Sequence, residues 1–259
     1  MSIIYCGKSN RTPYYIKEAD LNIYSIQELA YFVYNYAILI SNSFITKNLI
    51  IYIDKYLKLP RLSSDINEMY NKKANLADIL THILANSNFY DDDEISKFRR
   101  KLLSLLSLPE EEYISLAGDS LFHLKKYERA ITQYSKISKN NDNALFKLSF
   151  CYAKLQFYEN AANYLRELYK RTKSLDVLKE AYYVLKLNGT VDRIYDIEEH
   201  ISEEMLADWE FDIVSEIIKV RKSEEVKSME EIFLMGTAHI KESVYAIIKT
   251  WKEKYRYIG

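Results

Sequence analysis

Apolar residues recur every three to four positions through most of this chain, which is the spacing of one face of an α-helix. Capping boxes at Ser25–Glu28 and Ser228–Glu231 predict two helix starts, and Pro109 with Glu110 and Glu111 predicts another. The first 24 residues differ, because they hold two short β-prone runs, SIIYC and YYIK, around Gly7–Pro13. The pattern therefore predicts a helical protein preceded by a hairpin or an extended arm that packs on the helices.

Five helices are expected before Pro109. A capping residue marks the start of each, or a helix-breaking residue marks its end. The last of them is opened by Asp91–Glu94, whose carboxylates suit a helix N-terminus. Two further helices follow Ser202 and Ser228, and the last carries a broad apolar stripe. The predicted ranges are 25–40, 43 or 46 to 59, 61–71, 75–86, 91–106, 202–221 and 228–255.

Two segments between Glu112 and Tyr169 match each other with a fixed offset of 31 residues, which indicates an internal repeat. Small residues coincide at Gly118 and Ser149 and at Ala130 and Ala161, where they let two helices approach closely. One such helical hairpin cannot bury its apolar faces alone, whereas a stack of hairpins can. The other matched pairs are Ala117/Leu148, Leu121/Tyr152, Leu124/Leu155, Tyr127/Tyr158, Tyr134/Leu165 and Ile137/Leu168.

These residues resemble the tetratricopeptide repeat, a helix–turn–helix unit of about 34 residues. Gly118, the turn KKYERA and Ala130 fit the signature positions of that family. The chain departs from the pattern at Ile114 and Leu145, where the family has tryptophan, and at Asn141–Asp142, which replaces the closing proline. The period is also three residues shorter, which affects the turn between repeats more than the helices.

A third, degenerate copy is expected from Ser174 to His200, as helix LDVLKEAYYVLKL, a turn at Asn188–Thr190 and helix VDRIYDIEEHI. The resemblance implies an all-α fold in which paired helices form a right-handed αα-superhelix. An N-terminal helical bundle and the β-prone arm precede it. The expected parts are an arm at 1–24, a bundle at 25–108, repeats at 109–200 and capping helices at 201–259.

The charge and cysteine content narrow the possible partners. The formal net charge is −1, so no global basic field attracts nucleic acid, and we do not expect a nucleic-acid partner. Cys6 and Cys151 lie far apart, and Cys151 falls on an apolar helix, which favours a buried thiol and a reducing cytoplasm. The most apolar run, Leu29–Ile40, is too short to cross a bilayer, and Met1–Ile4 does not begin a signal peptide. We therefore expect a cytoplasmic protein with no membrane partner.

Motifs for catalysis or metal binding are missing from the sequence. The four histidines do not share the i, i+4 spacing of a metal pair, and Asp91–Asp93 lacks the alternating oxygens and glycine of a calcium loop. The glycines are isolated, so no phosphate-binding loop is present, and no serine lies in a nucleophile elbow. A basic run at Lys97–Lys101 fits one solvated helix face. We therefore expect neither an enzyme nor a metal or other cofactor.

The resemblance also implies a place for a ligand, because in tetratricopeptide proteins the first helices of successive repeats line a concave surface that holds peptides. Chaperone-binding members place Lys and Asn there to clamp a carboxylate, whereas this chain does not, so we expect a groove that prefers apolar side chains. Phe146 and Phe150 share a helix face, and they are either groove residues or core residues under the C-terminal helices. The expected lining is Ser115, Asp119, Phe122, His123, Phe146, Phe150, Ala153 and Lys154, with Val177 or Ala181 from the third copy.

Two functions fit this picture. The first is a non-catalytic adaptor or scaffold that holds a protein or peptide segment in the groove. The alternative is a peptide-sensing regulator whose N-terminal bundle acts on DNA or on an effector protein. The stripe of the helix at 228–255 is expected to close the end of the repeats in a monomer, or to form a weak homodimer.

Overall fold

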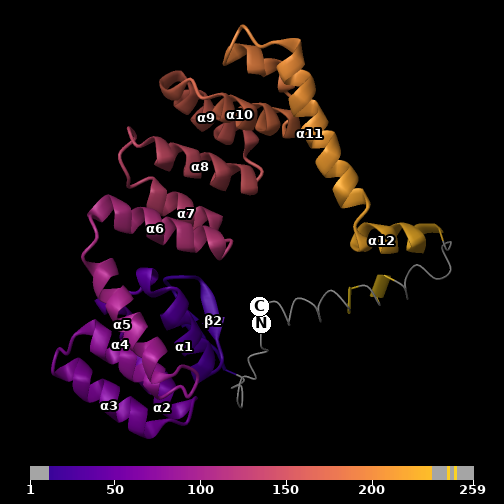
Figure 1. Cartoon of the computed structure of the whole chain (residues 1–259). Helices are drawn as coiled ribbons and strands as arrows, with labels where there is room; N and C mark the ends of the chain where they lie inside the picture. The colour runs from indigo at the N-terminus through magenta and orange to yellow at the C-terminus, as the bar shows by residue number, and fades with distance from the viewer. Residues whose placement is uncertain (1–11, 235–243, 246–247, 250–259) are drawn as a thin grey trace. The chain divides into compact units, whose positions relative to one another are not determined.

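The computed structural model describes residues 12–234, 244–245 and 248–249 (Figure 1). The described residues are mostly helical, and the sheet they contain has two short strands, which confirms the all-α class. The described residues up to Asn188 form one compact unit, and a second unit begins at Gly189. The candidate groove residues all belong to the first unit.

The N-terminal arm is a β-hairpin. Strand β1 (Tyr14–Ile16) pairs antiparallel with β2 (Leu21–Ile23), and Asp20 completes the turn with a left-handed φ of 53°. The run YYIK does form a strand, as predicted. Its partner is LNI, and the other β-prone run, SIIYC, lies outside the described residues. Ile16 and Ile23 are buried, so the hairpin belongs to the core of the first unit.

The bundle that follows has the predicted number of α-helices, but its first helix ends earlier than predicted. At Tyr36 the backbone (φ −121°, ψ 32°) leaves the helical region, so a short 3₁₀ turn replaces the expected helix end at Ile40. This turn brings Leu39 into contact with two hydrophobic clusters, one in the bundle and one in the repeats. The elements are α1 (Ile26–Asn35), η1 (Ala37–Leu39), η2 (Asn42–Phe44), α2 (Lys47–Lys55), α3 (Pro60–Asn71), α4 (Leu76–Ala85) and α5 (Asp92–Leu106).

Side-chain caps fix the starts of four of these five helices; for α2, where the sequence left Ser43 or Thr46 open, the cap is Thr46. The oxygens of Ser25, Thr46 and Asn75 accept hydrogen bonds from backbone N–H groups in the first turns of α1, α2 and α4. At α5, Asp91 and Glu94 form a reciprocal capping box. The apolar faces of the helices then meet in one cluster, and its fully buried members include Leu29, Ile40, Leu49, Ile53, Ile66, Leu80, Ile83, Leu84, Phe98 and Leu102.

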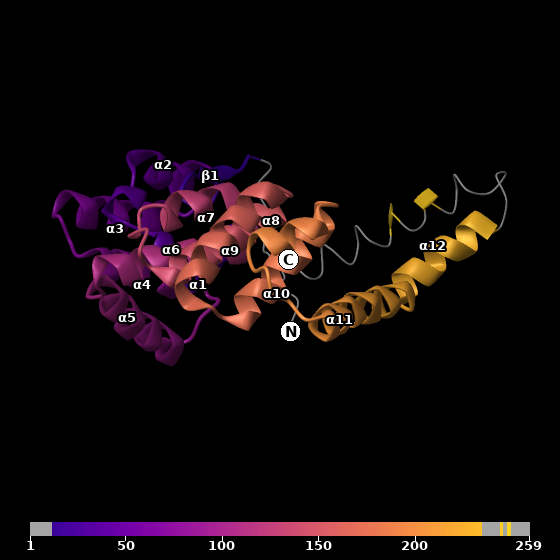
Figure 2. The same cartoon turned by 90° about the horizontal axis from the view of Figure 1, so that it is seen from above.

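Two helical hairpins follow the bundle, and each helix packs on the next (Figures 1 and 2). The turn inside each hairpin has the same conformation: Lys125 (φ 59°) and Gln156 (φ 63°) are both left-handed and stand 31 residues apart. The sequence match between the hairpins therefore extends to their local backbone geometry. The helices are α6 (Glu110–His123) and α7 (Tyr127–Tyr134), then α8 (Asp142–Lys154) and α9 (Tyr158–Thr172), followed by α10 (Leu175–Leu187).

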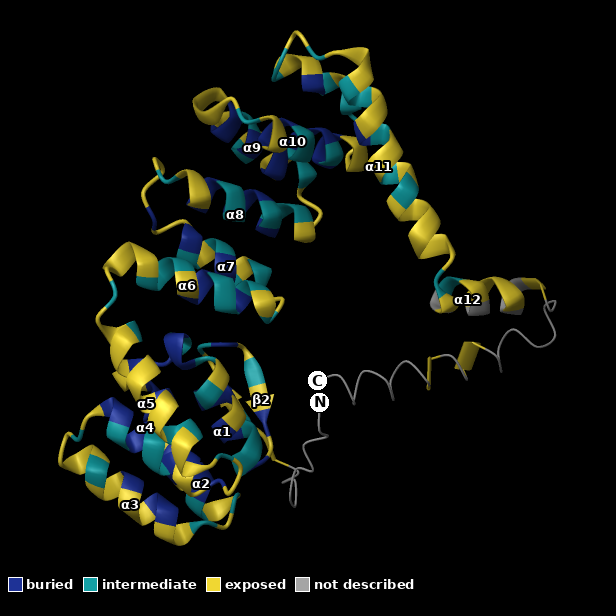
Figure 3. Ribbon diagram, in the orientation of Figure 1, coloured by how far each residue is buried: buried dark blue, intermediate teal, exposed yellow. Residues whose placement is uncertain are grey.

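Small residues lie where the helices of each hairpin meet. Gly118 of α6 faces the buried ring of Tyr134 on α7, and a Cβ at Gly118 would lie 2.4 Å from that ring. Ala130 and Ala161, at matched positions of α7 and α9, are both fully buried. Figure 3 shows buried positions alternating with more exposed ones along the helices of the repeat. The small residues of the repeat thus permit the close approach that the sequence predicted.

Polar contacts join the bundle to the first hairpin. The Tyr113 hydroxyl on α6 donates to the backbone oxygen of Ile38 at 2.7 Å. At the hairpin turn of the arm, the Asp20 carboxylate lies 2.9 Å from the Lys126 ammonium beside the start of α7. Together with Leu39, these contacts make the arm, the bundle and the repeats parts of one unit.

The contact around Asp20 predicts a pH-dependent stability. Hydrogen bonds from Lys126 and from the Tyr15 hydroxyl hold the pKa of Asp20 below its usual value. Because the folded-state pKa is lowered, this stabilisation is present at pH values above about 4 and disappears as the pH falls further. Asp20→Asn, which tolerates the left-handed turn, should lower the free energy of unfolding at pH 7 more than at pH 3.

Urea unfolding at both pH values measures this difference. Lys126→Gln is the matched control, because it removes the other partner and should reduce the same pH-dependent component. An equal effect of Asp20→Asn at pH 7 and pH 3 would contradict the assignment.

The second unit corrects two sequence predictions. The expected helix VDRIYDIEEHI is instead a short 3₁₀ turn, η3 (Val191–Asp196), in which only Ile194 is buried, so little apolar contact supports a full helix. Helix α12 (Glu224–Leu234) begins before Ser228, because Ser223 occupies the position before the first turn and accepts from the Val226 N–H. Helix α11 (Glu203–Arg221) begins after Ser202, as predicted. Most of the predicted C-terminal stripe lies outside the described residues.

Candidate functional site

Side chains from α6 and α8 meet directly, although they are about one repeat apart in the sequence. The Lys147 ammonium of α8 donates to Ser115 Oγ at 2.9 Å and to Asp119 Oδ2 at 2.8 Å, both on α6. The Tyr134 hydroxyl donates to the other Asp119 oxygen at 2.6 Å, and Lys147 lies 5.6 Å from the Tyr134 ring centroid. Ser115 and Asp119 therefore lie beside α8, and the first helices of the two hairpins are neighbours.

Lys147 was not among the residues predicted from the sequence. Its signal was its distance from the other two residues, 32 positions from Ser115 and 28 from Asp119. These separations bracket the repeat offset of 31, so Lys147 lies across from the middle of α6. If α6 and α8 are taken to be neighbours, the 31-residue period therefore predicts an ion pair that links the two repeats.

Two ionisable groups beside this network, the Tyr134 hydroxyl and the Cys151 thiol, have raised pKa values. Burial is the main reason that the pKa of Tyr134 lies well above its usual value, and the hydrogen bond to Asp119 raises it further. Burial, followed by the charge of Asp119, raises the pKa of the Cys151 thiol to about 12. Both groups are therefore protonated at neutral pH, and Cys151 is a buried free thiol, as the sequence predicted.

Three phenylalanines of the expected groove are half-buried. The rings of Phe146 and Phe150 on α8 lie 4.8 Å apart in an edge-to-face arrangement. The Phe122 ring packs edge-to-face on the Tyr127 ring, with the centroids 5.2 Å apart, and it contacts the hydrophobic cluster of the first hairpin. These neighbours cover much of the Phe122 surface. Of the three, the Phe146–Phe150 pair is the stronger candidate for ligand contact.

The remaining groove candidates divide by exposure. His123 and Lys154, in the last turns of α6 and α8, are exposed, and Ala153 is half-buried. The candidates from the third copy are wrong, because Val177 and Ala181 of α10 are 7% and 0% exposed and belong to the core. Their helix uses this face to pack, so it offers no ligand contact there.

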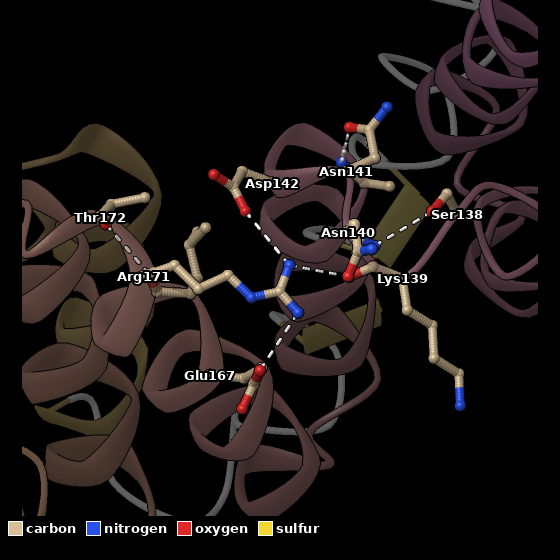
Figure 4. A network of polar contacts seen from close by, with 10 residues as sticks. Ser138, Lys139, Asn140, Asn141, Asp142, Glu167, Arg171 and Thr172 are labelled. Atoms are coloured by element: carbon tan, nitrogen blue, oxygen red, sulfur yellow. Dashed lines mark hydrogen bonds and ion pairs between the residues drawn. The ribbon is translucent and has the colours of Figure 1, made fainter.

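An arginine supports the turn between the two hairpins, where the closing proline of the repeat is missing (Figure 4). The Arg171 guanidinium of α9 donates to the Lys139 backbone oxygen at 2.9 Å, and it lies 3.4 Å from Asp142 and 3.1 Å from Glu167. Asn141 caps α8 by accepting from the Ala144 N–H. A side chain from the following helix thus fixes the start of α8, and with it the position of Phe146 and Lys147.

A metal site, a membrane-spanning helix and a basic surface for nucleic acid are further candidates in the described part of the chain. No three His, Cys, Asp or Glu residues in this part are grouped closely enough to hold a metal ion. Within the same part, no helix is both long enough and apolar enough to cross a membrane. In the basic run of α5, Lys97 pairs with Asp93 and Arg99 pairs with Asp78, each at 2.6 Å. These pairs reduce the positive charge that a nucleic acid would meet.

Comparison with known protein families, with curated proteins and with solved structures found no match to this chain. Functional conclusions therefore depend on the residues and geometry described above.

Proposed function

We propose that the chain is a non-catalytic adaptor that binds a protein or peptide segment on the surface formed by α6 and α8. The observation that carries the proposal is the direct contact of Lys147 with Ser115 and Asp119, since it puts the first helices of successive hairpins side by side. The half-buried Phe146–Phe150 pair lies on the same helix as Lys147. Buried aromatic contacts of this kind dominate the affinity of many interfaces.

The proposal includes a tetratricopeptide-like arrangement of α6 to α10. Support comes from the 31-residue match, the shared left-handed turn residues Lys125 and Gln156, and the packing of each helix on the next. In such an arrangement a ligand lies across the first helices of the hairpins. The chain acts in the cytoplasm, which fits its unpaired buried thiol, Cys151.

The chemistry of the surface defines the segment that it binds. The Lys147 ammonium lies 2.7 Å from Asp119 Oδ1, so the two charges neutralise each other. The centre of the surface therefore offers no free charge to clamp a terminal carboxylate. Phe146 and Phe150 provide the apolar contact, while His123 and Lys154 are exposed at one end. We therefore infer a ligand with one or two large apolar side chains, and an acidic group at the end that meets Lys154.

Peptide display against the full chain, followed by affinity measurement with a selected peptide, tests this function. Phe146→Ser combined with Phe150→Ser should weaken binding at least about tenfold, because two apolar anchors are lost. Phe157→Ser is the matched control: Phe157 is 55% exposed at the turn between α8 and α9, and its replacement should leave the affinity unchanged.

Circular dichroism verifies that each variant keeps its fold. Lys154→Glu adds a variant at an exposed position, and it should weaken acidic peptides without changing stability. Equal losses of affinity from Phe157→Ser and from the Phe146/Phe150 variant would contradict the proposed surface.

A further inference from the structure

A pocket of about 590 Å³ lies in the N-terminal part of the first unit, between β1 and α2. Its volume is in the range of small-molecule sites in proteins. Three tyrosines form a continuous aromatic row along it: the ring of Tyr52 lies 5.3 Å from Tyr14 and 5.5 Å from Tyr56. Phe44 adds a fourth aromatic ring to the lining. Tyr52 and Phe44 are buried in this wall, so the half-buried Tyr14 and the exposed Tyr56 are the rings that offer electron-rich faces to a ligand.

The row is held rigidly at its inner end. Tyr52 is almost fully buried, and its hydroxyl shares its single proton between the backbone oxygens of Ile23 at 3.0 Å and Thr12 at 3.2 Å. The Tyr14 hydroxyl lies 3.2 Å from Thr46 Oγ1. Tyr56, at the other end of the row, is in contrast exposed.

One lining carboxylate is incompletely compensated. Glu18 lines the pocket with its side chain only 14% exposed, and its buried Oε1 has no hydrogen-bond partner among the described residues. The Lys17 ammonium is 3.8 Å from that oxygen, beyond hydrogen-bond distance, and the Lys17 side chain is 65% exposed. A carboxylate held this way is stabilised when a further positive charge comes near.

We propose that this pocket binds an organic ammonium group, with the rings of Tyr14 and Tyr56 providing cation–π contacts and Glu18 providing the opposite charge. Aromatic faces beside a carboxylate attract such cations more strongly than neutral groups of the same size. The exposed Lys17 competes with the ligand for Glu18. The two neighbouring residues therefore have opposite effects on binding, which a purely apolar pocket does not produce.

Titration of the full chain with tetramethylammonium chloride, followed by amide NMR, tests the proposal. Sodium chloride at equal ionic strength corrects for salt, and tert-butanol is the neutral probe of similar size. Saturable shifts should appear in residues 12–18 and 43–56 with the cation, and shifts with tert-butanol should be much weaker.

Substitutions of the two charged residues give the decisive comparison. Glu18→Gln should weaken cation binding at least about fivefold, while Lys17→Met should strengthen it about twofold or more, since a competing charge is removed. Glu68→Gln, which makes the same charge change at an exposed pair on α3, should have no effect. Tyr56→Leu should also weaken binding. Because Tyr56 is exposed, this variant should keep its fold, so it tests the pocket independently even if Glu18→Gln is destabilised. Equal binding of tert-butanol and the cation, or unchanged cation binding in Glu18→Gln, would overturn the proposal.

Discussion

Gly118→Ser should lower the free energy of unfolding by about 2 kcal/mol, because it overpacks the first hairpin. The new Cβ would lie 2.4 Å from the ring of Tyr134, which is 2% exposed and therefore cannot move into solvent. Moving that ring would also break the hydrogen bond from its hydroxyl to Asp119. The helix-propensity gain from replacing glycine is below about 1 kcal/mol and does not offset this loss. Urea unfolding measures the change.

The second hairpin supplies the rescue for this substitution. Its matched positions hold Ser149 and Leu165 in place of Gly118 and Tyr134. The double variant Gly118→Ser/Tyr134→Leu should therefore recover more than half of the lost stability, and Ser149→Ala should cost less than about 1 kcal/mol. If the two losses simply add in the double variant, the two hairpins do not pack in the same way.

Leu80→Ala should lower the free energy of unfolding by about 2–5 kcal/mol. Leu80 of α4 is fully buried in the core of the bundle, and its truncation leaves a cavity among close-packed side chains. The melting temperature should fall by about 2–4 °C per kcal/mol for a unit of this size. Thermal unfolding followed by circular dichroism records the shift.

Leu103→Ala is the matched control for the bundle core. Leu103 lies on α5 and is 44% exposed, so the same truncation there should change stability by less than about 0.5 kcal/mol. A similar loss from both leucine variants would contradict the assignment of α4 to the core.

The features that the sequence predicted correctly are those fixed by neighbouring residues. A capping side chain bonds to the backbone two or three residues later, so Ser25, Asn75 and Asp91 mark the starts of their helices without any tertiary information. For α2 the sequence left Ser43 or Thr46 open, and the structure has Thr46. The small residues of the repeat were also predicted from the 31-residue match alone. These residues are buried, and Gly118 lies directly against the Tyr134 ring of the facing helix, as expected.

Features set by long-range contacts were not predicted. The turn that ends α1 at Asn35 packs Leu39 against the first hairpin, a contact that no local pattern reveals. In the third copy, Val177 and Ala181 were placed on a ligand surface, but their small size serves the packing of α10. The Lys147 ion pair was missed for a similar reason, because charged residues on a helix are ordinarily solvated. Its role follows only when α6 and α8 lie side by side.

Hydrogen exchange of the full chain with and without a selected peptide tests the central claim most directly. If α6 and α8 form the binding surface, the peptide should slow exchange in residues 115–123 and 146–154, while α3 and α4 exchange as before. Strong binding that leaves exchange in both of these segments unchanged, with protection elsewhere, would contradict the account.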